Sequence, residues 1–316
     1  MKKKNILITG GLGFIGSHIS NMLMEDNHII IVDNLSTGNI NNLINPNHDN
    51  LEIIKKDICE IDWNDILTDI DYIFHLAAMA SVPLSIDAPI KCNEVNLNAT
   101  VKLLDSAVKN NVQKIVFSSS AAVYGQNKNM PLKETEPLMP TSPYAASKAS
   151  CEIYLKSFYE SYGLNYTVLR YFNVFGPKQD KNSDYAAVIP NFISAFLSGK
   201  SPKIYGDGNQ TRDFIYVEDV ANANILACKS KYNGVVNIAS GEKISINQLF
   251  EVIKSNLGSE LEAEYLPKRQ GDIQHSLANI ENMSKIGFKL DSSKFENQLT
   301  ETIEWFKKVL WLILSD

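Results

Sequence analysis

Six short apolar runs recur along the first part of the chain, separated by amphipathic or polar stretches. Runs of strand length that alternate with helical patterns are typical of a parallel sheet with helices on both faces. Because the hydrophobicity within each run is continuous rather than alternating, we expect both faces of these strands to be buried. The pattern predicts an α/β fold with a doubly wound parallel sheet. The runs are NILITG, HIIIVD, LEIIKKD, YIFHLAA, KIVFSSS and YTVLRYFNV.

The alternation of strand-like and helical patterns changes after about Asn173, where the expected loops become longer and richer in Gly, Asp and Asn. The sequence there predicts a second, smaller region that closes over the first. A strand-like run at 234–240, GVVNIAS, is expected to return to the main sheet. We expect a first domain of residues 1–172, joined by about 213–240, and a smaller C-terminal α/β domain of 173–212 and 241–316. Four helical patterns follow Asn173: VIPNFISAFLSG, VEDVANANILAC, INQLFEVIKSNLG and FENQLTETIEWFKKVLWLIL. The second of them precedes the returning strand.

Composition excludes several classes of function. The chain has 316 residues and a net charge of -6, and no basic stripe follows the opening lysines, so we expect neither nucleic acid nor a membrane surface as a partner. The four cysteines are far apart and lack CxxC spacing, which predicts neither a zinc site nor a disulfide framework. We expect a cytoplasmic protein without a metal site.

Both ends of the chain carry apolar segments that resemble targeting signals. The start, MKKKNILITGGLGFIG, is basic and then apolar, but four glycines interrupt it and it has no clear cleavage site. It is predicted to be a first strand and its turn. The apolar run near the end, VLWLIL, is far shorter than the ~20 residues that span a bilayer. We expect the last turns of a packed helix.

The segment TGGLGFIG lies between the first apolar run and the first helical pattern, with glycines at 10, 11, 13 and 16. Such glycines allow backbone to approach a pyrophosphate at a helix N-terminus, although a glycine pattern alone can also be a tight turn. Asp33 ends the second run about 20 residues later, where a carboxylate binds the adenosine ribose. Together they predict a Rossmann-type dinucleotide site.

The residues after Asp33 indicate which dinucleotide is bound. The following NLSTG contains no arginine, and the carboxylate would repel the extra phosphate of NADP, so NAD is the expected cofactor. Asp57 ends the third run and could accept a hydrogen bond from adenine. An aspartate at a strand end is as often a helix cap or turn former, and both interpretations stay open.

Hydroxyl groups and one cation are predicted to meet at the end of the fifth run. Ser118, Ser119 and Ser120 end that run, at the sheet edge where open α/β sheets bind ligands. In YAASK, Tyr144 and Lys148 would lie one helical turn apart on the same face. A tyrosine titrates near pH 10, and we expect the nearby cation, together with the positive nicotinamide ring of NAD, to lower that pKa. The alternative is an ordinary amphipathic helix start with hydroxyls that cap a sheet edge.

The combination of the glycine motif with Ser and Tyr-x-x-x-Lys resembles the short-chain dehydrogenase/reductase superfamily. Five further blocks resemble its extended branch, the UDP-sugar 4-epimerases, and the resemblance runs from Lys4 to about Phe306: HLAAMASVPLSIDAP, NEVNLNAT, YFNVFGPKQD, GDGNQTRDFIYVEDV and RQGDIQHS. It implies that Tyr144 takes the proton of the sugar 4-hydroxyl while hydride passes from C4 to NAD. Ser120 would bond the same oxygen, and Lys148 would also hold the nicotinamide ribose. The 4-keto sugar would then receive the hydride on its opposite face.

The resemblance also implies two sets of binding residues. For Leu76 to Ala78, plain core packing would explain the residues equally well. The cofactor set is Gly10, Gly13, Phe14, Ile15, Gly16, Asp33, Asn34, Gly38, Asp57, Ile58, Leu76, Ala77, Ala78, Asn96, Ser118, Tyr144, Lys148, Tyr171 and Phe172. The set that would bind the UDP-sugar is Ser81, Ser120, Tyr144, Asn173, Val188, Ile189, Ile204, Tyr205, Arg212, Arg269, Asp272 and Ser276.

Within the second set, the chemistry suggests a division of roles. Arginine suits bidentate phosphate binding, and Arg212 and Arg269 match the positions that grip the diphosphate, with Asn173 as a further phosphate contact. Asp272 would bond the uridine ribose. The uracil slot would be lined by 188–190 and 204–206. Each arginine alone could equally form a surface salt bridge.

The residue types at a few single positions distinguish the activities of the related enzymes in this branch. Dehydratases and decarboxylating enzymes of this branch need an acid after the last serine, and Ala121 and Ala122 occupy those positions. Ser276 replaces the tyrosine of glucose-restricted members, which leaves room for an N-acetyl group and predicts that UDP-GlcNAc and UDP-GalNAc are accepted alongside UDP-glucose and UDP-galactose. The alternatives are a UDP-glucuronate 4-epimerase and an NAD-binding protein without turnover. The resemblance also implies a homodimer through the helices after Asn96 and after Pro143.

Overall fold

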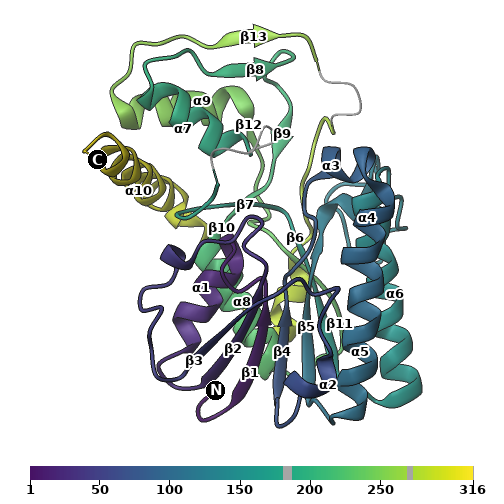
Figure 1. Ribbon diagram of the computed structural model, residues 1–316. Coiled ribbons are helices and arrows are strands. Elements are labelled where there is room, and N and C mark those ends of the chain that lie inside the picture. Colours follow the sequence, from purple (N-terminus) through teal and green to yellow (C-terminus); the bar gives the residue numbers. More distant parts are fainter. Residues whose placement is uncertain (181–186, 269–272, 316) are drawn as a thin grey trace.

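The computed structural model describes residues 1–180, 187–268 and 273–315. Its centre is a parallel seven-stranded sheet with the order β11-β6-β5-β4-β1-β2-β3 (Figure 1). The predicted α/β class and parallel sheet are confirmed, including the return of β11 to the sheet edge beside β6. The strands are β1 (Asn5–Thr9), β2 (His28–Asp33), β3 (Leu51–Lys55), β4 (Tyr72–His75), β5 (Lys114–Ser120), β6 (Tyr166–Tyr171) and β11 (Gly234–Ile238).

Helices cover both faces of this sheet, as the alternation of the sequence predicts. One apolar cluster joins the sheet to α1 (Phe14–Leu23) and α8 (Val217–Lys229). A second cluster joins the opposite face to α2 (Trp63–Ile66), α5 (Ala99–Lys109) and α6 (Pro143–Tyr162). The other short helical segments of this part are η1 (Ile40–Asn42), α3 (Val82–Asp87), α4 (Pro89–Asn93), the π-helical turn η2 (Glu94–Asn98) and η3 (Ala121–Tyr124).

The long helix α6 begins at a position that its sequence specifies. The Ser142 hydroxyl accepts a hydrogen bond from the Ala145 backbone N–H at 3.2 Å, and Pro143 occupies the first helical position. Gly163 ends the helix in the left-handed conformation, with φ +75°. This start fixes Tyr144 and Lys148 in the first two turns, beside the C-terminal edge of the sheet.

A smaller part of the chain lies above the C-terminal ends of the strands (Figure 1). Its apolar core contains Phe192 of α7, Phe250 of α9 and Ile303 of α10, and all three are buried. The four helical patterns predicted after Asn173 are all observed. The elements of this part and its connections are β7 (Asn173–Phe175), α7 (Val188–Leu197), β8 (Lys203–Tyr205), β9 (Thr211–Arg212), β10 (Phe214–Tyr216), β12 (Ile244–Ser245), α9 (Ile246–Leu257), β13 (Glu264–Leu266), η4 (Glu281–Ile286), η5 (Ser292–Lys294) and α10 (Phe295–Ser315).

Three expectations need correction. The run LEIIKKD forms β3, which lies at the sheet edge and is only partly buried, because an edge strand has a neighbour on one side only. The run YTVLRYFNV is divided into β6 and β7, and β7 leaves the main sheet to pair with β10. The C-terminal apolar run is helical, but Trp311 is 68% exposed, so packing against the core does not extend to that residue. Within the described residues, no helix combines the length and apolar character needed to cross a membrane.

Candidate active site

The glycine-rich turn joins β1 to α1 and brings the backbone of two strand ends together. Gly10 has φ +68°, and a Cβ there would lie 2.9 Å from the backbone nitrogen of Ala77 after β4. A Cβ at Gly16 would overlap the Gly10 carbonyl oxygen. Only glycine fits these two positions. The turn therefore leaves the N-terminus of α1 open to an anionic group, as a pyrophosphate site requires.

Asp33 at the end of β2 holds the glycine-rich turn from the other side. Its carboxylate accepts hydrogen bonds from the backbone N–H of Leu12 at 3.0 Å and of Leu35 at 2.8 Å. A Cβ at Gly38 would lie 2.6 Å from Asp33 Oδ1, so the 33–38 loop closes tightly on the carboxylate. A carboxylate offers roughly four acceptor positions. Two hydrogen bonds therefore leave it with capacity for the hydroxyls of a ribose.

The serine, tyrosine and lysine of the sequence motif meet where β5 ends beside α6. The Ser120 hydroxyl and the Tyr144 phenol are hydrogen-bonded. The Lys148 Nζ donates to the Ser118 carbonyl oxygen at 2.7 Å and lies 4.8 Å from the centre of the Phe117 ring. Lys148 is 4% exposed, and burial lowers the pKa of its ammonium to about 8. The arrangement offers a phenol, a hydroxyl and a cation to one ligand.

In the chain alone, the pKa of Tyr144 is shifted upward. Burial raises the pKa of the phenol, and the hydrogen bond from Ser120 lowers it less than burial raises it. The Lys148 ammonium is engaged by the Ser118 carbonyl instead of by the phenol. The lysine is therefore not among the causes that shift the tyrosine pKa in the chain alone, and the lowering expected with NAD bound stays a prediction. A ligand that brings further positive charge to the phenol would be needed to favour phenolate.

The chain matches the model of the NAD dependent epimerase/dehydratase family over residues 6–239. It belongs to this family. A "Putative UDP-glucose 4-epimerase" of Methanocaldococcus jannaschii is 41% identical over 306 residues, which cover 96% of this chain and 98% of the relative. Membership in the epimerase/dehydratase family confirms the resemblance inferred from the Ser and Tyr-x-x-x-Lys residues.

Solved structures of epimerases superpose on the whole chain. The UDP-N-acetylglucosamine 4-epimerase from Methanobrevibacter ruminantium, in complex with UDP-N-acetylmuramic acid, has a TM-score of 0.97 at 60% identity and covers 98% of this chain and 99% of its own. The UDP-glucose 4-epimerase of Thermotoga maritima, with UDP-glucose, has a TM-score of 0.91 at 40% identity and covers 97% and 99%. The fold of this epimerase/dehydratase chain is therefore the fold of solved UDP-sugar 4-epimerases over nearly its whole length.

In this family member, the predicted adenine contact Asp57 forms a turn. Its Oδ2 accepts from the Asn34 side chain at 3.0 Å, and its Oδ1 accepts from the Cys59 backbone N–H at 2.9 Å. The Cys59 backbone hydrogen bond is the main reason why the pKa of Asp57 is lowered. Ile58 is buried in the core. The structure thus supports the turn-forming interpretation of Asp57, and a contact with adenine stays a prediction.

Asn96 connects the segment after β4 to the catalytic helix of this epimerase/dehydratase chain. Its Oδ1 accepts from the Met79 backbone N–H at 2.7 Å. Its Nδ2 donates to the Met79 carbonyl at 3.1 Å and to the Ser147 hydroxyl at 3.0 Å. Asn96 lies in the π-helical turn η2 and is buried. The side chain therefore anchors the 76–79 segment beside Lys148, which is a supporting role for a residue predicted to touch the cofactor.

A buried histidine that the sequence analysis missed joins the first and fourth strand ends. Thr9 Oγ1 lies 2.6 Å from His75 Nδ1, and His75 Nε2 lies 2.8 Å from Thr100 Oγ1. The Thr100 hydroxyl donates to the Asn96 carbonyl, so it accepts from Nε2–H, and the Thr9 hydroxyl then donates to Nδ1. Thr9 Oγ1 also accepts from the backbone N–H of Leu76 and of Ala77, both at 3.2 Å. The imidazole is neutral, and burial lowers its pKa to about 3.

This neutral histidine predicts a loss of stability in acid. The unfolded chain binds a proton on His75 below its usual pKa of about 6.5, whereas the folded chain does so only near 3. The free energy of unfolding should therefore fall by about 1.4 kcal/mol per pH unit from this group as the pH drops below 6.5. We expect His75→Gln to be less stable at pH 7.5 but to lose less stability between pH 6.5 and 4.5. Denaturant unfolding across this range measures the slope.

The exposed His28 supplies the matched control for this measurement. His28→Gln makes the same substitution at an exposed position, so it reports any general effect of replacing a histidine by glutamine on the unfolding measurement. An acid slope that His75→Gln leaves unchanged would contradict a neutral buried imidazole.

The remaining residues of the predicted cofactor set lie around the ends of β5 and β6. The Ser118 hydroxyl donates to the Tyr171 oxygen at 2.9 Å, because the Tyr171 hydroxyl itself donates to Asn224 Oδ1 at 2.9 Å. Phe172 is buried against Tyr124. Phe14 and Ile15 begin α1 and are partly buried, next to the glycine-rich turn. The structure thus gathers this set at the C-terminal edge of the sheet.

The predicted substrate residues fall into three groups in the epimerase/dehydratase fold. Arg212 and Ser276 lie together, since Arg212 Nη1 and the Ser276 N–H both donate to the Thr211 carbonyl, at 3.0 and 3.1 Å. Asn173 Nδ2 donates to the carbonyl of Asp213, between β9 and β10, at 2.8 Å. Arg269 and Asp272 lie outside the described residues.

The other predicted substrate residues contribute through backbone or through helix formation. Ile189 and Ile204 are fully buried in the apolar core of the smaller part, so only their backbone can line a ligand slot, while Val188 and Tyr205 are half-buried. The Ser81 hydroxyl accepts from the Leu84 N–H at 3.2 Å and caps α3. Contacts of these residues with a nucleotide sugar stay a prediction.

Asp213 is a second buried residue that the sequence analysis missed. Its carboxylate accepts from the Ser240 N–H and hydroxyl, both at 2.7 Å, and from the N–H of Gly241 and of Ala278, both at 3.1 Å. Burial raises the pKa of Asp213 to about 6. The residue ties the segment before β10 to the end of β11 and to the strand-like segment behind Ser276. Among the described residues, no group of three His, Cys, Asp or Glu side chains could hold a metal ion.

Proposed function

We propose that this family member is an NAD-dependent UDP-hexose 4-epimerase. It would interconvert UDP-GlcNAc with UDP-GalNAc, and UDP-glucose with UDP-galactose, through a 4-keto sugar. The observation that carries the proposal is the hydrogen-bonded pair Ser120 and Tyr144 beside the buried Lys148, at the sheet edge that also carries the glycine-rich turn. The 60% identity to a UDP-N-acetylglucosamine 4-epimerase supports it.

The residues of the cofactor site fit NAD. The glycine-rich turn leaves room for a pyrophosphate at the N-terminus of α1, and the Asp33 carboxylate can accept the ribose hydroxyls. The chemistry that bound NAD supplies is reversible hydride transfer at C4 of the sugar. Residues proposed to hold it are Gly10, Gly13, Phe14, Ile15, Gly16, Asp33, Asn34, Gly38, Asp57, Ile58, Leu76, Ala77, Ala78, Asn96, Ser118, Tyr144, Lys148, Tyr171 and Phe172.

The proton steps belong to the chain's own residues. Tyr144 takes the proton of the sugar 4-hydroxyl as C4 is oxidised, and returns a proton to the same oxygen when C4 is reduced on its opposite face. Ser120 hydrogen-bonds that oxygen and holds it against the phenol. The Lys148 ammonium lies one helical turn from Tyr144, and we expect it to favour phenolate only together with the positive charge that bound NAD would add near the phenol. No proton or electron is gained or lost over the full cycle.

The turn after the catalytic serine argues against dehydration and decarboxylation. Ala121 and Ala122 form the start of η3, and the Ala122 N–H donates to Ser120 Oγ at 3.1 Å. These positions hold no carboxylic acid that could move protons at C5 and C6 of the sugar. An alternative, UDP-glucuronate 4-epimerisation, uses the same Ser120, Tyr144 and Lys148 and is separated from the proposal by substrate tests.

We propose that Ser276 sets the tolerance for an N-acetyl group. Its backbone is fixed to Thr211 beside Arg212, and its small side chain leaves volume there. We expect Ser276→Tyr to lower kcat/KM for UDP-GlcNAc by at least about tenfold, because a bulky ring would occupy the space for the N-acetyl group. The value for UDP-glucose should stay within about threefold. Steady-state assays with both sugars measure the ratio.

A matched control for this variant is Ser276→Ala, which removes the hydroxyl without adding volume. It should retain the wild-type ratio of the two kcat/KM values. Equal loss of both substrates in Ser276→Tyr would contradict a role in sugar selection. Turnover of UDP-glucuronate alone would replace the proposal by the alternative.

We further propose which part of the chain binds NAD, which part binds the nucleotide sugar, and that the protein is cytoplasmic. Residues 1–172 with 213–240 would bind NAD, and 173–212 with 241–316 would bind the nucleotide sugar. Four free cysteines are compatible with a reducing cytoplasm.

We propose a homodimer through α6 and the helices after Asn96. Tyr162 and Ile153 on α6 are each 63% exposed, which leaves apolar side chains of this helix away from the sheet. Sedimentation velocity should give about twice the 35.3 kDa chain mass, and a single species at the chain mass would exclude the dimer.

A further inference from the structure

Three neighbouring strands carry polar side chains at the same level of the central sheet. Ser119 on β5 pairs in register with Arg170 on β6, and Arg170 pairs with Asn237 on β11. All three are buried, and Arg170 and Asn237 stand between apolar or aromatic neighbours on their strands. Register partners in a sheet project to the same face, so the three side chains form one polar row. This row lies one residue before the level of Ser120.

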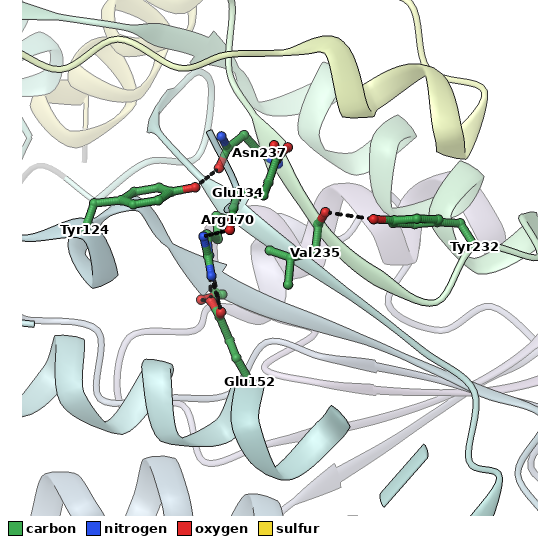
Figure 2. Close-up of polar contacts among 8 residues, drawn as sticks. Tyr124, Glu134, Glu152, Arg170, Tyr232, Val235 and Asn237 are labelled. Atoms are coloured by element: carbon green, nitrogen blue, oxygen red, sulfur yellow. Dashed lines mark hydrogen bonds and ion pairs between the residues drawn. The ribbon is translucent and has the colours of Figure 1, made fainter. Parts of the chain in front are cut away.

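A carboxylate of the catalytic helix neutralises the charge of this row. Arg170 donates from Nε to both Glu152 oxygens, at 3.0 and 3.2 Å, and from Nη2 to Oε2 at 2.6 Å (Figure 2). The Ser119 hydroxyl donates to Glu152 Oε1 at 2.5 Å. The guanidinium also donates to the Glu134 carbonyl at 3.2 Å and lies 4.8 Å from the centre of the Tyr124 ring. A buried ion pair is tolerated only when its hydrogen bonds are made this fully.

The position of Ser119 connects this ion pair to the active site. Ser119 lies between Ser118 and Ser120 in the sequence. The Ser118 carbonyl accepts a hydrogen bond from the Lys148 ammonium, and the Ser120 hydroxyl is hydrogen-bonded to Tyr144. Glu152 lies one turn beyond Lys148 on α6. The bond from Ser119 to Glu152 therefore spans the same gap between β5 and α6 as the contacts of Ser120 and Lys148.

The other end of the row reaches the segments that flank the substrate residues. The Tyr124 hydroxyl, in η3 after Ser120, donates to Asn237 Oδ1 at 2.6 Å. Asn237 Nδ2 donates to the carbonyl oxygens of Leu132 at 2.9 Å and of Asn279 at 3.2 Å. Asn279 lies three residues after Ser276. One network of polar contacts thus connects this row to α6, to the turn after Ser120 and to the segment behind Ser276.

We propose that Ser119, Glu152 and Arg170 are positioning residues that fix the end of β5 against α6 and so set the separation of Ser120, Tyr144 and Lys148. They act through these residues and need not touch substrate or cofactor. The proposal rests on the proposed epimerase function and goes beyond it by assigning a task to residues outside the Ser, Tyr and Lys set.

Ser119→Ala tests the proposal, because it removes one hydroxyl and leaves the Arg170 and Glu152 pair in place. A shift of the reacting groups by a fraction of an ångström is expected to lower kcat by about tenfold, while KM for the UDP-sugar stays within about twofold. Thr167→Val is the matched control. Thr167 is on β6, is buried, and donates its hydroxyl to the Tyr232 carbonyl at 2.9 Å. It should lose comparable thermal stability and keep kcat within about twofold.

A double variant, Glu152→Met with Arg170→Met, provides an independent test. Apolar side chains of similar length can replace a buried ion pair without loss of the fold. The variant leaves the Ser119 hydroxyl without its carboxylate, and the same loss of kcat is expected. Wild-type kcat within about twofold in both Ser119→Ala and the double variant would overturn the proposal.

Crystal structures of the same variants separate this proposal from the proposed function. Ser119→Ala should change the distance between Ser120 Oγ and Tyr144 Oη, and Thr167→Val should not. That comparison needs no turnover, so it decides the positioning role even if the wild type acts on neither UDP-sugar. An unchanged distance in Ser119→Ala would overturn the positioning role.

Discussion

Tyr144→Phe is expected to lower kcat by about 10³-fold while KM for the UDP-sugar stays within about threefold. The change deletes the only atom of the residue that can exchange a proton with the sugar 4-hydroxyl and keeps the ring. The phenol is shielded from solvent, as its burial-raised pKa indicates, so water cannot easily reach the same position to act as a base. Steady-state assays, with sugar binding measured separately by calorimetry, distinguish lost chemistry from lost affinity.

Tyr162→Phe is the matched control for this prediction. Tyr162 ends the same helix, 63% exposed and far from the sheet edge that carries the site. Its kcat should equal that of the wild type. Turnover by Tyr144→Phe within about tenfold of the wild type would exclude the phenol as the general base. A wild type that binds UDP-sugar without turnover would instead support the binding-only alternative.

Lys148→Met is expected to lower kcat by about 10²-fold and to weaken NAD binding. Methionine fills similar space beside the Phe117 ring, but it supplies no charge to favour phenolate and leaves the Ser118 carbonyl without its ammonium donor. Burial lowers the Lys148 pKa to about 8, so the wild-type ammonium loses its proton as pH rises through 8. Wild-type kcat should therefore decline above that pH, and the variant should lack this limb.

Lys156→Met serves as the control, since Lys156 lies on the exposed side of the same helix. Its kcat and pH profile should match the wild type. A Lys148→Met variant with wild-type kcat at pH 7 would show that the cation is not needed for proton transfer. An alkaline limb that persists in Lys148→Met would assign that limb to another group.

Local sequence patterns were sufficient to predict most strands of the central sheet. Continuous apolar runs predict β1, β2, β4, β5 and β6, because strands buried on both faces are mostly apolar rather than alternating. The edge position of β3 and the departure of β7 from the sheet were not predicted. Both depend on which strand lies alongside, and β9 and β12 are two residues long, too short to carry a period.

The residues of the candidate site likewise divide into those that local motifs predicted and those that were missed. Gly10, Asp33, Tyr144 and Lys148 stand in motifs whose spacing is local, and the structure brings them to one edge of the sheet. Asp213, His75 and the Arg170 and Glu152 pair were missed, since their partners come from distant segments, as with Asp213 and Ala278, 65 residues apart. A single polar residue within an apolar run, such as His75 in YIFH or Arg170 in YTVLRY, is the signal that could have identified them.

The most direct test of the epimerase function is incubation of the purified wild type with UDP-GlcNAc and, separately, with UDP-glucose, with and without added NAD. Proton NMR resolves the C4 epimers of each sugar. The account predicts that UDP-GalNAc forms from the first and UDP-galactose from the second, with no net consumption of NAD. Formation of neither epimer, even with NAD supplied, would contradict it.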